Sequence, residues 1–139
     1  MAIIDTLPGV EVTVQVDKEA LREYNDDEGD RPKHIHPNGH HVSKYIEAID
    51  DQEFTILTTL RQPYAPDSPS VTAKTYIDGQ RADGRIAKNL AYAMINRCKL
   101  RSKGNTRVNA ETGIATRYNY KFSRLNICKA NHMGCCCHD

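Results

Sequence analysis

The sequence predicts a mainly β protein, an antiparallel β-sandwich of the jelly-roll or immunoglobulin-like kind with at most one short helix. Three observations lead to this class. Short segments that alternate apolar and polar residues recur along the chain, turn residues separate these segments, and no long helical pattern alternates with them. A parallel α/β fold would need such an alternation of strands and helices. A chain of 139 residues has the usual size of one domain.

The clearest strand lies at residues 10–16, where four valines alternate with polar residues. This period of two is typical of a strand with one face buried and one face in water. Residues 17–24 allow two interpretations, a short helix with Asp17 as its N-cap or the turn and second arm of a hairpin in which Leu21 and Tyr24 cover the core. We favour the hairpin.

The middle of the chain predicts a loop and a second hairpin. Residues 25–41 are charged, then rich in Pro, Gly and His, and show no apolar periodicity, so we expect an exposed loop. Residues 42–49 and 53–60 are expected to be the two strands of this hairpin, with the turn at Asp50-Asp51. In the second strand, Phe54, Ile56 and Leu60 share one face.

Three further segments follow in the second half. Residues 71–77 predict a strand closed by the turn Asp78-Gly79. Residues 86–100 suit a helical stripe, whereas 97–103 alternate like a strand, and periodicity alone does not decide between them. The last strand contains three aromatic residues that alternate with polar ones and are expected to point inward, Tyr118, Tyr120 and Phe122.

We expect residues 1–127 to form a single β-sandwich domain and residues 128–139 to form a disordered tail rich in Cys and His. The 19 Lys and Arg residues nearly balance the 18 Asp and Glu residues, so net charge predicts no polyanionic partner. No apolar run approaches the roughly 20 residues that span a bilayer, and the N-terminus lacks a signal-peptide pattern. We therefore expect an intracellular protein, cytoplasmic or nuclear, neither secreted nor transmembrane.

The order of several short motifs resembles an uncharacterised fungal family, the domain of unknown function 7918. In the first half these motifs are Leu-Pro-Gly-Val-Glu-Val-Thr-Val with the following Leu-Arg-Glu-Tyr, and Val-Ser-Lys-Tyr-Ile-Glu-Ala before Glu-Phe-Thr-Ile. In the second half they are Tyr-Ile-Asp-Gly-Gln-Arg-Ala-Asp-Gly and Arg-Tyr-Asn-Tyr-Lys-Phe-Ser-Arg-Leu-Asn-Ile. The resemblance implies a β-rich domain and brings no known activity or catalytic residues. Family members commonly continue into polar, lysine-rich sequence, so the Cys and His ending predicts a shortened or alternatively ended product.

Two segments carry residues that bind zinc or copper in proteins. One is the histidine-rich part of the loop, where His34 and His36 would project to the same side of an extended chain, with His40 nearby. The other is the tail, whose candidate ligands are Cys128, His132, Cys135, Cys136, Cys137 and His138. The spacing in the tail matches no structural zinc motif, and the loop would still need a third or fourth ligand held in fixed geometry. We therefore expect no resident cofactor and keep zinc or copper binding as the alternative.

Four cations alternate with small or apolar residues near the end of the ambiguous segment: Arg97, Lys99, Arg101 and Lys103. A strand would place all four on one face, where they could bind the phosphates of a nucleic acid. A solvent-facing strand whose cations guard an exposed edge against aggregation is the simpler explanation.

No nucleophile elbow, phosphate-binding glycine loop, dinucleotide fingerprint or paired-histidine metalloprotease motif occurs in the sequence. We therefore predict a non-enzymatic protein-interaction module that recognises an unknown protein partner through a sheet edge or the loop 25–41. The alternatives are a nucleic-acid-associated protein that uses the basic strand, and a metal-binding accessory protein that uses the tail. We expect no membrane partner, and the sequence does not indicate an oligomeric state.

Overall fold

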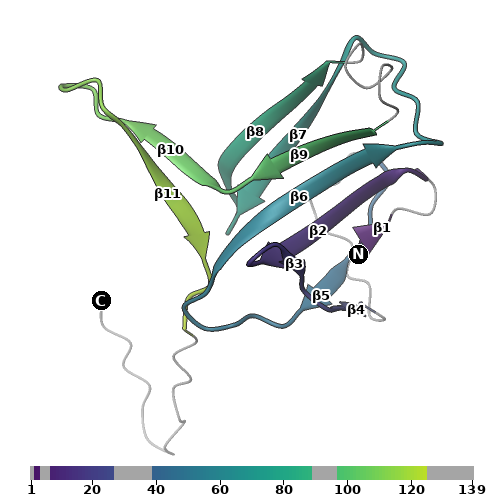
Figure 1. Cartoon of the computed structure of the whole chain (residues 1–139), viewed down its shortest axis with the longest axis horizontal. Helices are drawn as coiled ribbons and strands as arrows, with labels where there is room; N and C mark the ends of the chain where they lie inside the picture. The colour runs from purple at the N-terminus through teal and green to yellow at the C-terminus, as the bar shows by residue number, and fades with distance from the viewer. Residues whose placement is uncertain (1, 4–6, 27–38, 89–96, 125–139) are drawn as a thin grey trace, which may run out of the picture.

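A computed structural model describes residues 2–3, 7–26, 39–88 and 97–124 of the chain (Figure 1). All regular elements in these ranges are strands: β1 (Ala2–Ile3), β2 (Val10–Val16), β3 (Glu19–Ala20), β4 (Glu23–Asn25), β5 (Lys44–Ile46), β6 (Glu53–Arg61), β7 (Ser70–Ile77), β8 (Gln80–Lys88), β9 (Arg97–Ser102), β10 (Gly104–Val108) and β11 (Ala115–Lys121). Every pairing is antiparallel and the sheets do not close into a barrel. The mainly β prediction is confirmed, and the described ranges contain no helix, so none of them holds one able to cross a membrane.

Strand β6 is the centre of the largest sheet. Six of its nine residues pair with β2 along one edge, from Leu60 opposite Val10 to Thr55 opposite Gln15. Its other edge is shared by β9, which pairs with residues 56–61, and by β11, which pairs only with residues 53–54. Because β6 is longer than either partner on this edge, it holds both β9 and β11 in register.

The hairpin β7–β8 forms a second layer against one face of this sheet (Figure 1). Leu60 of β6 and Ala87 of β8 are buried against each other, and partly buried side chains surround them: Val10, Tyr64, Val71, Cys98 and Leu100. These side chains come from both layers, so the fold is sandwich-like, with its core between the β6 sheet and the β7–β8 hairpin.

Two tight turns match the sequence predictions. Asp17 and Lys18 have φ values of 50° and 72°, and Asp78 and Gly79 have values of 49° and 75°. Two successive positive φ angles are the geometry of a type I′ hairpin turn, which suits the twist of the flanking strands. Residues 17–20 therefore form a hairpin with β2 and no helix begins at Asp17. The prediction that Tyr24 covers the core is wrong, because Tyr24 lies in the small β4–β5 ribbon opposite Tyr45 and is 42 % exposed.

The predicted hairpin between residues 42–49 and 53–60 is wrong. Strand β5 pairs with β4 instead, and β6 takes β2, β9 and β11 as partners. The three residues of β5 offer β6 few ladder hydrogen bonds, whereas the seven residues of β2 match most of its length. The turn at Asp50-Asp51 is present, with Asp51 at a φ of 62°, but it leads from β5 into β6 without pairing them.

The ambiguous segment divides between two strands. Residues 86–88 end β8 and residues 97–102 form β9, as the alternating pattern predicted, while residues 89–96 lie outside the described ranges. The valines of β2 share one face as expected, yet they are only half-buried. The side chain that β2 buries is Glu11, at 8 % exposed, and it forms an ion pair with Arg61. The prediction that Glu11 faces water is therefore wrong, because a partner from β6 compensates its charge.

Candidate functional site

Strands β10 and β11 form a hairpin, here called the arm, that projects away from both layers (Figure 1). The two strands pair over five residues, from Gly104 opposite Asn119 to Val108 opposite Ala115. Only the end of β11 pairs with β6. Three large apolar side chains of the arm are exposed to solvent by 57–64 %, Val108, Ile114 and Tyr118. The arm therefore exposes apolar surface that the rest of the described chain leaves uncovered.

The tip of the arm is a defined turn. Its organiser is Asn109, whose Oδ1 accepts hydrogen bonds from the backbone N–H groups of Glu111 (2.8 Å) and Thr112 (3.1 Å). The backbone of Asn109 closes the turn by accepting from Gly113 and donating to Ile114, both at 2.9 Å. Gly113 has a φ of 68°, which glycine adopts without steric cost. These bonds fix the conformation of the tip before any partner binds.

Aromatic packing holds the base of the arm. Phe54 of β6 stacks on Phe122 with ring centroids 4.4 Å apart and contacts Tyr120 at 5.5 Å. Tyr120 is 7 % exposed, so the prediction of inward aromatics is confirmed for Tyr120 and for the half-buried Phe122. It is wrong for Tyr118, which has the same parity but is 57 % exposed. Strand β11 pairs with β6 only at Tyr120 and Lys121, whereas Tyr118 pairs with β10 in the projecting arm.

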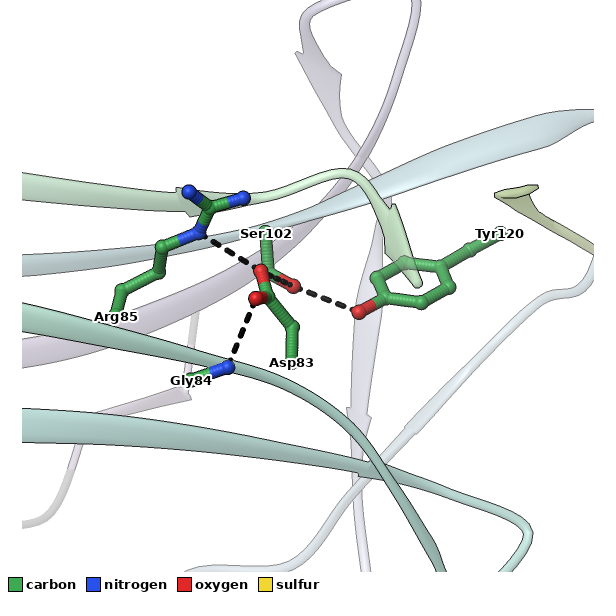
Figure 2. Close-up of polar contacts among 5 residues, drawn as sticks. All are labelled: Asp83, Gly84, Arg85, Ser102 and Tyr120. Carbon is green, nitrogen blue, oxygen red and sulfur yellow. Dashed lines mark hydrogen bonds and ion pairs between the residues drawn. The ribbon is translucent and has the colours of Figure 1, made fainter. Parts of the chain in front are cut away.

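A chain of polar contacts also ties the arm to both layers (Figure 2). The hydroxyl of Ser102 on β9 donates to Oδ2 of Asp83 on β8 at 2.8 Å. The oxygen atoms of Ser102 and Tyr120 lie 2.8 Å apart, and because the Ser102 proton is used on Asp83, Tyr120 donates this second bond. The carboxylate also accepts from the Gly84 N–H and from Nε of Arg85, each at 2.8 Å.

These contacts keep Asp83 ionised. Its partial burial alone would raise the pKa of the carboxyl group, but the hydrogen bonds from Ser102, Gly84 and Arg85 and the charge of Arg85 outweigh that effect. The pKa of Asp83 therefore lies below its usual value. Ser102 is only 3 % exposed and its hydroxyl is engaged on both sides, so it links strands and does not present a nucleophile to a ligand.

The predicted basic residues lie along β9. Arg97, Lys99 and Arg101 occupy one face of the strand, opposite the side chains that face the β7–β8 layer, and Lys103 follows directly after the strand. Arg97 and Lys99 are exposed, while Arg101 is half-buried. In the parts of the chain that the structure describes, none of the four lies within 4.0 Å of a carboxylate. Their charges are thus available to a ligand.

Positive charge is concentrated in this part of the chain. Residues 97–124 contain a single carboxylate, that of Glu111, and eight cations: Arg97, Lys99, Arg101, Lys103, Arg107, Arg117, Lys121 and Arg124. The whole chain has a net charge of +1, so the remainder carries −6. Although the net charge of the whole chain is close to zero, β9 and the arm therefore form a basic region.

The predicted metal ligands fall mostly outside the described ranges. This applies to His34, His36 and all six tail residues, whereas His40 is placed in an exposed stretch before β5. Within the described ranges, no group of three or more His, Cys, Asp or Glu residues lies close enough to hold a metal ion. Metal binding by the tail and by His34 and His36 stays a prediction.

Fold and site together define an all-β, sandwich-like domain with a projecting basic hairpin. The family model for the domain of unknown function DUF7918 matches residues 9–134, so the chain belongs to that family, as its motifs indicated. Comparisons with curated proteins and with solved structures found no match. The family has no assigned activity.

Proposed function

We propose that this domain is a non-enzymatic protein-interaction module and that the arm is its main contact element. The observation that carries the proposal is the exposure of Val108, Ile114 and Tyr118 on a hairpin with a fixed turn. Exposed apolar surface on a rigid element costs free energy in water, and a partner that covers it recovers that energy with little loss of conformational entropy.

The composition of the arm suits a protein interface. Tyr and Arg are the residue types enriched among the side chains that dominate binding energy. The guanidinium of Arg107 lies over the Tyr118 ring, 5.8 Å from its centroid, so the two side chains already form one surface. Protein partners bury such aromatic and guanidinium pairs at the centre of an interface.

The small core also supports a role in binding. Among the described residues, five apolar side chains are buried while nine large apolar ones are exposed by 36 % or more. Single exposed apolar residues are ordinary, but three of these nine lie on the arm, which projects away from both layers. The arm is thus a place where association with a partner would cover exposed apolar side chains.

The proposal is tested by capture from a native extract with matched variants of the full chain. Val108→Ser, Ile114→Ser and Tyr118→Ser combined should remove the captured proteins. Tyr76→Ser and Ile86→Ser combined are the control, because these side chains are equally exposed but lie on the β7–β8 hairpin. Identical partner sets for wild type and the arm variant, with both folded by circular dichroism, would overturn the proposal.

A second candidate function is nucleic-acid association through β9, favoured by the row of Arg97, Lys99 and Arg101 without carboxylate partners in the described chain. Alternate residues of a strand lie about 6.6 Å apart, which is similar to the spacing of phosphates along an extended single strand. Phosphate contacts of this kind release counterions, so binding to random RNA or DNA should weaken steeply with salt.

Charge reversal separates this candidate from the first. Arg97→Glu with Lys99→Glu should abolish binding to random RNA, whereas Lys74→Glu with Arg81→Glu on the other layer should change it little. Arg101 is left intact because it also supports neighbouring strands. Binding that is insensitive to the β9 variant would eliminate the nucleic-acid candidate and leave the arm proposal unaffected.

A further inference from the structure

We propose that a hollow at the end of β9 is a binding site for a single phosphate group. The hollow has a volume of about 500 Å³ and lies where the β2–β3 turn, the start of β6, the end of β9 and β11 meet. Three cations line it, Lys18, Arg101 and Lys103, together with the polar side chains of Gln15 and Thr55. This inference is independent of the arm proposal.

The central group is the guanidinium of Arg101. Its Nη1 donates to Oε1 of Gln15 at 2.9 Å and to Oγ1 of Thr55 at 3.3 Å, and both acceptors are neutral. These two bonds orient the side chain from one side. No described residue accepts a hydrogen bond from its Nε or Nη2. The Nε and Nη2 groups of this half-buried guanidinium leave three N–H donors for an oxyanion.

The carboxylates at the hollow do not neutralise these cations. Asp17 and Glu53 also line it, but neither lies within 4.0 Å of a Lys or Arg in the described chain. One oxygen of Glu53 instead accepts a hydrogen bond from Nδ2 of Asn119 at 2.9 Å. With three cations and two carboxylates the lining carries a net charge of +1, which suits one phosphate group better than a long polyanion.

Phosphate is the class of ligand that this donor set fits. Its oxygen atoms can take a pair of parallel hydrogen bonds from the Arg101 fork, while Lys103 and Lys18 act as point charges from other directions. The phosphate can be the free ion or a monoester on a small molecule. Inorganic phosphate and glycerol 3-phosphate are therefore the two probes that distinguish these sources.

The test is a titration of the full chain with each probe at constant ionic strength, followed by the amide signals of the hollow in ¹H–¹⁵N spectra. We expect saturable shifts at Gln15, Thr55, Arg101 and Lys103. Tighter binding of glycerol 3-phosphate would identify a monoester ligand, and tighter binding of inorganic phosphate the free ion. The absence of saturable shifts with both probes would overturn the proposal.

Variants make the assignment specific. Arg101→Met and Lys103→Met should each raise the dissociation constant about tenfold or more, because each removes a charge-assisted contact. Lys74→Met on β7 is the matched control and should leave the constant unchanged. Lys103 is exposed and its side chain makes no hydrogen bond or ion pair with a described residue, so its variant tests the site even if Arg101→Met disturbs the fold. An equal loss in the Lys74 variant would contradict the proposed location.

Discussion

The phenol of Tyr120 and the hydroxyl of Ser102 share a 2.8 Å hydrogen bond that joins the arm to the inner face of β9. Ser102 passes this connection to Asp83 on the other layer. Two side-chain hydrogen bonds thereby link β8, β9 and β11. Ser102 lies 19 residues after Asp83 in the chain and 18 residues before Tyr120. The orientation of the arm therefore depends on these polar contacts together with the aromatic packing at its base.

Tyr120→Phe should lower the free energy of unfolding by about 1–2 kcal/mol, because it removes the bond to Ser102 and leaves a buried acceptor with one partner fewer. The control is Tyr118→Phe, in the same strand but 57 % exposed, which should change stability by less than about 0.5 kcal/mol. Urea denaturation measures both. Equal effects of the two substitutions would show that the hydroxyl bond contributes nothing.

Asp83→Asn should change how stability depends on pH. Burial opposes ionisation of Asp83, but its hydrogen bonds to Ser102, Gly84 and Arg85 prevail and hold its pKa below the usual 3.8. The folded protein thus binds fewer protons than the unfolded chain, so this contribution to stability is complete above that value and is lost as the pH falls through the lower, folded pKa. The variant should be less stable at pH 7 and should lose less stability on acidification.

The control for this experiment is Asp67→Asn, which makes the same change of net charge at an exposed position. Unfolding curves at a series of pH values from neutral to strongly acidic give the comparison. If the free energy of unfolding of the wild type and of Asp83→Asn differed by the same amount at every pH, ionised Asp83 would not stabilise the fold.

Gly104→Ala should distort the start of the arm. A β-carbon at this position would fall on the carbonyl oxygen of Tyr118, which belongs to the opposing strand backbone and cannot swing aside. We expect a loss of about 1–3 kcal/mol, the usual cost of overpacking. Gly84→Ala is the control, since its β-carbon would meet only the end of the flexible Arg81 side chain. Similar stabilities of the two variants would contradict the close approach at Gly104.

Leu60→Ala should be the most damaging of these substitutions, with a loss of about 2–5 kcal/mol, because Leu60 is 3 % exposed in the contact between the layers. Ile86→Ala, next to the buried Ala87 but 67 % exposed, should cost under about 1 kcal/mol. Thermal or urea unfolding of both variants checks this. A small effect at Leu60 would mean that the layers do not pack as described.

The strands that sequence predicted best are those whose alternation is strong over many residues. The valine row of β2 and the aromatic row of β11 fix which residues share a face, because side chains alternate along any strand. The alternation of side chains does not predict which strands pair with each other. The partners of β6 depend on competition among segments far apart in the chain, so adjacency of residues 42–49 and 53–60 was a poor guide.

The polar chain at the base of the arm was not predicted. Asp83, Ser102 and Tyr120 are common residue types whose significance comes only from their meeting in space. Two signals were visible, the inward parity of Tyr120 and the position of Ser102 opposite the cations of β9. Asp83 gave none, because a carboxylate beside a glycine usually indicates a turn. The basic row could be predicted once β9 was taken as a strand, whereas the hollow at its end depends on tertiary structure.

The most direct test of the arm as the contact element is hydrogen–deuterium exchange of the full chain, alone and saturated with a protein captured from the extract. Amides that become covered exchange more slowly, so the method locates the contact without mutation. We expect added protection to concentrate in residues 104–121, with little change in β7. Protection elsewhere, together with unchanged exchange in the arm, would contradict the account.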